Sequence, residues 1–473
     1  MASKLLLVGL ATDGPTNIVN RLTNETSFAK LYGDNFVERF SVSSSATGLV
    51  LRYDPWKTPN NSVDNRLEYL YLPYIDSSNT KLIRFGNIGG SGNHVVDMTY
   101  TPYLGEKDLL ISGKRFAQAI NDSVYVLRVG GTAASSLVDG WQFEAKYPGS
   151  RYNNLSITSN GTSIVISGME PNYLARTFTF TSVEKLKRDI DTDFSFGACP
   201  LVCTIPGTAM IAAGTYYVTG GTDGTFSDEE FALAMDATIP TDVSHVVILA
   251  PATSSIMSTI ETYLIQKENS PKMFFVQAPD FYEPTSTWVS NMVSYLPYRN
   301  NMVSLFLGTV ETVFNATNLT RYSVEAGALA FMKAGSYNLT NRAVDAINFN
   351  PVLSETDLRL VKANGFIPLM RYIGNDVSTY EGINSAGASF LLSSKLAEIS
   401  SIAYEYCSQF FGYSIQDGEQ TDMARELANR LGIITFLTIT QVNIYKTENS
   451  LYVRVEGFLP EEILNISFTI RAR

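Results

Sequence analysis

The stretch Val246-Val247-Ile248-Leu249-Ala250-Pro251 decides the fold class of this chain. It is an uninterrupted apolar run of the kind found in strands that are covered on both faces of a sheet. A helical pattern follows over residues 255–266, and another apolar strand is predicted at Met273-Phe274-Phe275-Val276. Because strands that alternate with helices pack side by side as a parallel sheet, the sequence predicts an α/β core.

The N-terminus opens with a unit of the same kind. Residues 5–8 are predicted to form a buried strand, followed by a turn at Asp13-Gly14-Pro15. A short helix is predicted over residues 25–32 and ends at Gly33. We assign residues 1–40 to the first part of the α/β core.

A β-rich insert is predicted at residues 41–112. Short aromatic and β-branched runs occur there at residues 67–72, 81–85 and 94–98, separated by Asn, Ser, Gly and Pro. The α/β core then resumes over residues 113–345 with further β-structure. Its predicted elements are a helix at 115–121, strands at 124–129, 141–146 and 155–166, and more β-structure to about Val218.

One helix start in this region has a clear local signal. Ser227-Asp228-Glu229-Glu230 is a capping box, in which the serine accepts from a backbone N–H and the glutamate reaches back to the N-cap. Phe226 and Phe231 are spaced as a hydrophobic staple around it.

Residues 346–473 are predicted to form a C-terminal α+β domain. Ser354-Glu355-Thr356-Asp357 starts a helix that ends before Gly365, and further helices are predicted at residues 393–410 and 422–430.

The chain ends in β-structure. Residues 438–445 and 451–455 alternate apolar and polar side chains and form a hairpin with a polar loop. A third strand at residues 465–471 follows a predicted linker, Gly457-Phe458-Leu459-Pro460.

Composition limits the classes of function. The chain has 473 residues, 45% of them hydrophobic and 17% charged, which is typical of an ordered protein with two to four domains. Its net charge of −11 disfavours non-specific nucleic-acid binding, which requires a cationic surface. No signal-peptide core and no run of ~20 apolar residues occurs, so we expect neither export nor membrane insertion.

Catalytic residues are scarce. His94 and His245 are the two histidines that could act as a general base, and no nucleophile elbow accompanies either of them. An α/β hydrolase therefore stays only as an alternative, and ordinary surface or core histidines are the favoured interpretation.

Cofactor and metal sites are not indicated either. Cys199, Cys203 and Cys407 lack the partners of a zinc site and are interpreted as buried thiols. The glycine-rich stretch at residues 86–92 lacks the Gly-Lys-Ser/Thr ending of a phosphate-binding loop, and residues 220–224 are interpreted as a turn. We expect no cofactor.

Several of these features resemble one family, the sheath proteins of contractile phage tails. The most specific match is the segment from Phe143 to Leu155, with Tyr152-Asn153 where Gly-Asn is usual in the family. The other matching segments follow the family's order along the chain and are residues 8–15, 27–33, 124–129, 220–224, 324–330, 353–357, 364–365 and the final hairpin with its strand.

The resemblance implies a non-enzymatic structural subunit with a subtilisin-like α/β core, an outer β-rich insert and a C-terminal domain that links subunits. Such a subunit polymerises around an inner tail tube and contracts to drive the tube through the host envelope. Implied partners are other copies, the inner tail tube protein, and baseplate and tail terminator proteins, in the virion tail after synthesis in the host cytoplasm. A non-contractile virion protein of the baseplate or capsid is the alternative.

One departure from the family concerns the N-terminus. Related chains carry an arm of some two dozen residues before the first strand, whereas only seven residues precede Val8 here. We expect either that the C-terminal strand carries more of the linkage between subunits or that residues 1–7 act as a reduced arm.

The C-terminal strand is the candidate linking element. Ile466, Phe468 and Ile470 share one face of the strand, the period-two pattern of a half-buried strand. From this pattern alone, pairing within its own chain and donation to a neighbour are equally supported, and the resemblance favours donation. Burying the three side chains would contribute on the order of 5–9 kcal/mol before ordering costs. The candidate acceptor residues are Val442, Ile444, Val453 and Val455.

Overall fold

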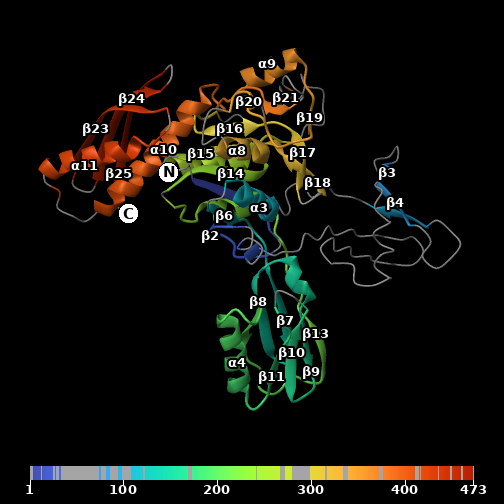
Figure 1. Cartoon of the computed structure of the whole chain (residues 1–473). Coiled ribbons are helices and arrows are strands. Elements are labelled where there is room, and N and C mark those ends of the chain that lie inside the picture. The colour runs from blue at the N-terminus through green and yellow to red at the C-terminus, as the bar shows by residue number, and fades with distance from the viewer. Residues whose placement is uncertain are drawn as a thin grey trace. The chain divides into compact units, whose positions relative to one another are not determined.

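The computed structural model divides the chain into two compact units, Met1–Tyr32 with Leu104–Arg473, and Gly33–Tyr103 (Figure 1). The residues that the structure describes are 4–11, 13–24, 27, 31–32, 74–75, 81–85, 94–98, 108–120, 123–168, 173–240, 242–266, 272–279, 299–314, 317–333, 339–371, 376–410, 415, 417–434, 436–447, 450–459 and 462–471. The predicted helix at residues 25–32 and the predicted strand at residues 67–72 lie largely or wholly outside them.

Within the unit Gly33–Tyr103, the described residues form an antiparallel sheet of β3 (Tyr74–Ile75), β4 (Lys81–Phe85) and β5 (His94–Met98). β4 and β5 coincide with two of the three strands predicted for the insert.

In the larger unit, seven strands of the described part form a predominantly parallel sheet, which confirms the predicted α/β core. β2 at one edge is antiparallel to its neighbour. In spatial order the strands are β2 (Val19–Leu22), β6 (Val124–Arg128), β1 (Lys4–Gly9), β14 (Val243–Pro251), β15 (Met273–Gln277), β16 (Val303–Phe306) and β20 (Phe366–Ile367).

β14 shows why the deciding stretch is continuously apolar. Val246 and Ile248 belong to one hydrophobic core, whereas Val247 and Leu249 belong to a second core on the opposite face. All four side chains are fully buried, each worth roughly 1.5–3 kcal/mol of transfer free energy.

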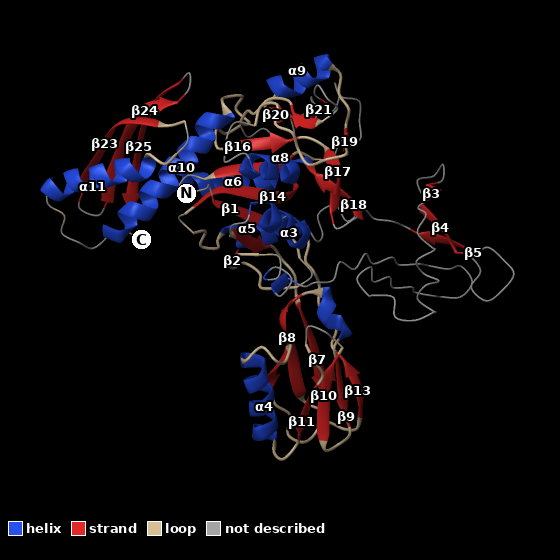
Figure 2. Ribbon diagram, in the orientation of Figure 1, coloured by secondary structure: helices blue, strands red, loops and turns tan. Residues whose placement is uncertain are grey.

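Helices cover both faces of this sheet (Figure 2). On the first face lie α5 (Asp228–Met235), α6 (Ser254–Gln266) and α9 (Glu355–Ala363). On the second face lie α3 (Asp108–Ile120), α8 (Ser323–Lys333) and α10 (Phe390–Cys407). α3 begins seven residues before the predicted helix at 115–121, inside the range that the sequence assigned to the insert.

The capping prediction for α5 is half right. Ser227 accepts a 3.2 Å hydrogen bond from Glu230 N, and the staple rings of Phe226 and Phe231 lie 5.4 Å apart. The Glu230 carboxylate does not return to the N-cap, because it accepts instead from the backbone N–H groups of Thr225 at 3.0 Å and Gly131 at 3.3 Å. For α9 the prediction is confirmed, with Ser354 as N-cap and Gly365 at a φ of +83° after the helix.

Residues 134–218 have a hydrophobic core of their own. One sheet contains β7 (Ala133–Val138), β8 (Trp141–Pro148) and β12 (Leu201–Ile205), and a second contains β9 (Ser156–Ser159), β10 (Ser163–Ser167), β11 (Arg176–Thr179) and β13 (Gly214–Tyr217). The short 3₁₀ helix η1 covers Ser150–Asn154.

The helix α4 (Val183–Ser195) was not predicted within this β-rich region. Ser182 caps its N-terminus by accepting from Lys185 N at 3.2 Å. Leu186 and Ile190, four residues apart, are fully buried against the sheets. Both signals are visible in the sequence.

The remaining strands of the larger unit form three small sheets. The first two contain β17 (Thr309–Phe314), β18 (Thr317–Tyr322) and β19 (Asn348–Asn350), and β21 (Leu369–Arg371) with β22 (Val377–Thr379). The third contains β23 (Thr438–Thr447), β24 (Ser450–Leu459) and β25 (Glu462–Arg471) and is preceded by η2 (Ser408–Phe410) and α11 (Asp417–Leu431).

Candidate assembly site in the C-terminal sheet

The sheet β23-β24-β25 packs on α10 and α11. Alternating residues of β24 are buried, among them Leu451, Val453 and Val455 with exposures of 3%, 0% and 0%. They share a hydrophobic core with Tyr404 and Cys407 of α10 and with Leu427 and Leu431 of α11. The period-two pattern is therefore explained by one face of the sheet lying on two helices.

The four predicted acceptor residues lie together on that buried face. The hairpin register pairs Val442 with Val455 and Ile444 with Val453. Ile444, Val453 and Val455 are buried, and Val442 is partly buried against the same core.

β25 pairs with β24 of its own chain, antiparallel and along all ten residues of both strands. The register sets Ile466 opposite Val455, Phe468 opposite Val453 and Ile470 opposite Leu451. The predicted linking residues and two of the predicted acceptors thus meet within a single chain. Leu451 was missed by the sequence prediction, although it continues the alternation of Val453 and Val455. Donation of β25 to a second chain stays a prediction.

The predicted linker is wrong over most of its length. Gly457, Phe458 and Leu459 belong to β24, and β25 starts at Glu462, so that only residues 460 and 461 separate the two strands. Gly457 is needed for close strand approach, because a Cβ atom there would lie 2.5 Å from the carbonyl oxygen of Thr438. A shift of register between Ile439 and Gln441 accompanies this approach.

The opposite face of the sheet carries aromatic and charged side chains. Tyr445 and Tyr452 are cross-strand neighbours with ring centroids 6.2 Å apart, and Phe458 is 49% exposed. Arg454 Nη2 lies 2.7 Å from Glu456 Oε1 on the same strand. Substitutions on this face leave the core on α10 and α11 untouched.

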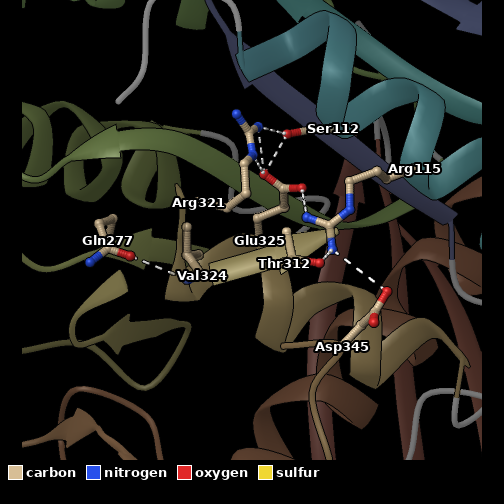
Figure 3. A network of polar contacts seen from close by, with 8 residues as sticks. All are labelled: Ser112, Arg115, Gln277, Thr312, Arg321, Val324, Glu325 and Asp345. Carbon is tan, nitrogen blue, oxygen red and sulfur yellow. Dashed lines mark hydrogen bonds and ion pairs between the residues drawn. The ribbon is translucent and has the colours of Figure 1, made fainter. Parts of the chain in front are cut away.

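A buried ion cluster holds the α/β core together (Figure 3). Glu325 of α8 accepts from Arg115 of α3 at 2.6 Å, from Arg321 at 2.7 Å and from Ser112 at 2.8 Å. Burial alone would raise the pKa of Glu325, but the two guanidinium groups outweigh it and hold this pKa below its ordinary value.

Gln277 fixes the start of the same helix. Its Oε1 accepts from Val324 N at 3.2 Å (Figure 3). Its Nε2 donates to Gly308 O at 2.9 Å. The segment 324–330, which carries part of the family resemblance, is thus a buried helix whose first turn is bonded to Gln277 at the end of β15.

A second polar cluster joins the strand ends of the parallel sheet to the β-rich region of residues 134–218. Arg128 is fully buried and donates to Gly14 O at 2.7 Å and to Pro148 O at 2.6 Å. Asp13 accepts from Tyr152 Oη at 2.7 Å and from Arg151 Nη1 at 3.2 Å. Burial raises the pKa of Asp13, while Tyr152 and Arg151 act in the opposite direction.

Four of the segments with family resemblance, residues 8–15, 124–129, 143–155 and 220–224, meet at this cluster. Asn153 exchanges two hydrogen bonds with the backbone of Gly221, at 2.9 Å and 2.8 Å. Thr222 pairs with Thr132 as an antiparallel β-bridge, so part of the segment 220–224, which was predicted as a turn, is extended instead. Tyr152, which departs from the family pattern, supplies the hydroxyl that reaches Asp13.

His245 is a satisfied core residue. Its Nδ1 lies 2.8 Å from Ser244 Oγ and its Nε2 lies 3.0 Å from Ser394 Oγ, and neither His245 nor Ser394 is exposed. Burial first, and the nearby Lys395 and Lys272 second, lower the pKa of His245 to about 3. A substrate has no access to this Ser–His pair. His94 lies on β5, and its side chain is outside the described residues.

The three cysteines are free and buried. Burial raises the pKa of Cys199 and Cys203 to about 11 and that of Cys407 to about 12, so their thiols are weak nucleophiles. In the described ranges, no group of three or more His, Cys, Asp or Glu side chains could hold a metal ion. None of the described helices is long and apolar enough to cross a membrane.

No protein-family model and no curated protein sequence matches the chain. Many solved structures match its fold, and two of them match it along the whole length with a TM-score above 0.5. The sheath tail protein Lin1278 from Listeria innocua matches with a TM-score of 0.60 and 12% sequence identity, covering 100% of this chain and 96% of that protein. A sheath tail protein from Desulfitobacterium hafniense matches with a TM-score of 0.56 and 11% identity, covering 100% and 97%. The chain therefore has the fold of the tail sheath proteins, the family that its sequence resembles.

Proposed function

We propose that the chain is the structural subunit of a contractile phage tail sheath. It polymerises as stacked rings or a helix around the inner tail tube and contracts to drive the tube through the host envelope. The observation that carries the proposal is the fold match, which covers 100% of this chain and at least 96% of two tail sheath proteins. Classification of the core as subtilisin-like stays part of the proposal.

Contraction in this proposal is a rearrangement between subunits that move as nearly rigid bodies. The energy is stored in subunit contacts at assembly, so nucleotide hydrolysis is not required. Two buried polar clusters support rigidity within a subunit, one centred on Glu325 and the other on Arg128. Breaking either would leave buried charges without partners, which opposes deformation of the core.

The link between neighbouring subunits is the donated strand β25. Ile466, Phe468 and Ile470 of one copy would pair with β24 of the next, beside Val453 and Val455. The pairing of β25 with β24 within one chain supports this step. A strand of ten residues fits β24 along its full length, and the β24 of a second copy offers an identical surface. Residues 4–7 belong to the central strand β1 and are paired on both sides, so the proposal leaves the linkage to β25.

Further partners follow from the same proposal. The inner tail tube protein contacts the sheath along its length, and baseplate and tail terminator proteins contact its two ends. The chain is made in the host cytoplasm and resides in the virion tail. The net charge of −11 fits an assembly without direct nucleic-acid contact.

Negative-stain electron microscopy of the purified full chain tests the proposal. Hollow tubes or short stacks of rings are expected, with a wider and shorter form on contraction. Closed shells or single plate-like complexes would instead support a non-contractile capsid or baseplate protein. Hydrolysis that depends on His94 or His245 would support the α/β hydrolase alternative, against which the burial of His245 and Ser394 argues.

A further inference from the structure

We propose that the unassembled subunit is self-closed: its own β25 occupies the position that a neighbour's strand takes in the sheath, which makes opening of the subunit the slow step of polymerisation. The inference rests on the proposed function and adds a control on assembly to it. In the closed state one segment hides both halves of the linkage, since β25 is not free to be donated and β24 is not free to accept.

The register shows how completely the site is closed. Every residue of β24 from Ser450 to Leu459 has a partner in β25, and Ser450 itself is paired with Arg471 near the chain end. An unpaired β24 would expose a row of backbone donors and acceptors beside Val453 and Val455, which invites association with any extended chain. Self-closure keeps this edge satisfied in a free subunit.

Strand exchange changes the number of contacts between β24 and β25 little, because each residue pair within one chain is replaced by the same pair between two chains. What it requires is separation of a ten-residue strand before the new pairs form. The equilibrium between closed and linked subunits is therefore decided by the other contacts that a neighbour adds, and the rate is decided by opening. At a growing end the acceptor is already open, so only the incoming copy has to separate its strand.

The structure also indicates where the chain opens. Only residues 460 and 461 connect β24 to β25. Release of Gly457, Phe458 and Leu459 from the end of β24 would give a connection of five residues, with a reach of about 17 Å. Phe458 is half-exposed and Gly457 carries no side chain, so exposure of Leu459, which is 4% exposed in the closed state, is the main cost of releasing this end of β24.

The hairpin β23-β24 is expected to stay intact. β23 packs on α11, and its Ile444 shares the core with Leu427 and Leu431. A lock between β23 and β24 should therefore leave assembly unchanged, whereas a lock between β24 and β25 should abolish it. This contrast gives a matched pair of variants.

The test uses two double cysteine variants that share one position. Arg454→Cys with Ser467→Cys joins a directly opposed pair of β24 and β25, and Arg454→Cys with Asn443→Cys joins a directly opposed pair of β24 and β23. Opposed residues in an antiparallel sheet have Cα atoms about 4.5–5.5 Å apart, within the range of a disulfide. The native cysteines are buried, and the wild-type chain is oxidised in parallel to check that they stay free.

Each variant is oxidised before assembly, and tubes are counted by negative-stain microscopy with and without reductant. The expected result is loss of tubes for the β24–β25 lock, recovery on reduction, and normal tubes for the β23–β24 lock. Oxidation of the reduced β24–β25 variant after assembly should give covalent multimers on a non-reducing gel, because the paired cysteines then belong to different chains.

Tubes from the oxidised β24–β25 variant in normal number would overturn self-closure, while the sheath proposal would stand. Covalent monomers alone after oxidation of assembled tubes would also overturn it, because β25 would then have stayed in its own chain. Absence of tubes for the wild-type chain and for the reduced variants would count against the sheath proposal itself, and self-closure would fall with it.

Discussion

Arg115 of α3 and Glu325 of α8 form an ion pair at 2.6 Å across 210 positions of sequence. Their side chains are 3% and 1% exposed, so water does not screen the pair. Arg321 occupies the second carboxylate oxygen. Because a buried ion left without its partner is costly, this contact is a point at which the stability of the core can be tested.

The variant Glu325→Gln should lower the free energy of unfolding by about 3–5 kcal/mol, since two buried arginines lose their carboxylate. Urea unfolding followed by circular dichroism measures this. Asp345→Asn is the matched control, because Asp345 lies 3.8 Å from Arg115 but is 59% exposed. Its effect should stay within about 0.5 kcal/mol. Equal effects of the two variants would contradict the assignment of the network's stability to Glu325.

Stability should fall as the pH drops from 6.5 toward 3 because of His245. Its pKa in the folded chain is lowered to about 3, so the unfolded chain binds a proton that the folded chain refuses. The loss should approach about 4–5 kcal/mol at the lower limit. Between pH 6.5 and 4.5 the lowered pKa of Glu325 adds nothing to this loss, because it acts only below its ordinary value, whereas the raised pKa of Asp13 acts in the opposite direction.

The variant His245→Gln keeps a hydrogen-bonding side chain but cannot titrate. Its urea midpoint should therefore vary less between pH 6.5 and 4.5 than that of the wild-type chain. An unchanged slope in the variant would show that other groups cause the pH dependence.

The cluster at Asp13 should depend on the hydroxyl of Tyr152. Tyr152→Phe removes the 2.7 Å hydrogen bond to a buried carboxylate and should cost about 1–3 kcal/mol of stability. Tyr217→Phe, at a tyrosine that is 65% exposed, should change stability by less than about 0.5 kcal/mol. Thermal unfolding compares the two, and a similar shift in both would remove the special role of Tyr152.

The parts of this fold that the sequence predicts are those determined by interactions between residues close together in the chain. The strand at 246–251 and the caps at Ser227 and Ser354 follow from local pattern and are confirmed. Such features carry their own signal, because a period of burial or an N-cap involves residues within one or two turns.

Other features depend on partners that sequence does not place. Glu230 has the spacing of a capping box, but Gly131, 99 residues away, takes its carboxylate. Gly457 resembles a linker glycine, yet the close approach of Thr438 requires it within a strand. The Arg115–Glu325 pair joins residues 210 positions apart, so no local pattern in the sequence predicts it.

A variant chain that ends at Leu459 tests strand donation and strand acceptance separately. It lacks β25, so it can accept a strand on β24 but has none to give. It should stay folded, because Val453, Val455 and Leu459 of β24 still pack in one core with α10 and α11. Alone, it should form no long tubes.

When it is mixed with the wild-type chain, the shortened chain should terminate the growth of tubes. Each incorporated copy takes a strand from one neighbour and offers none to the next, so tube length should fall as its mole fraction rises. The oxidised variant Arg454→Cys/Ser467→Cys is the control, because a closed copy neither gives nor accepts and should leave tube length unchanged. If the shortened chain instead entered tubes without shortening them, the link between subunits would lie elsewhere than in β25, since a missing donor would then break no connection.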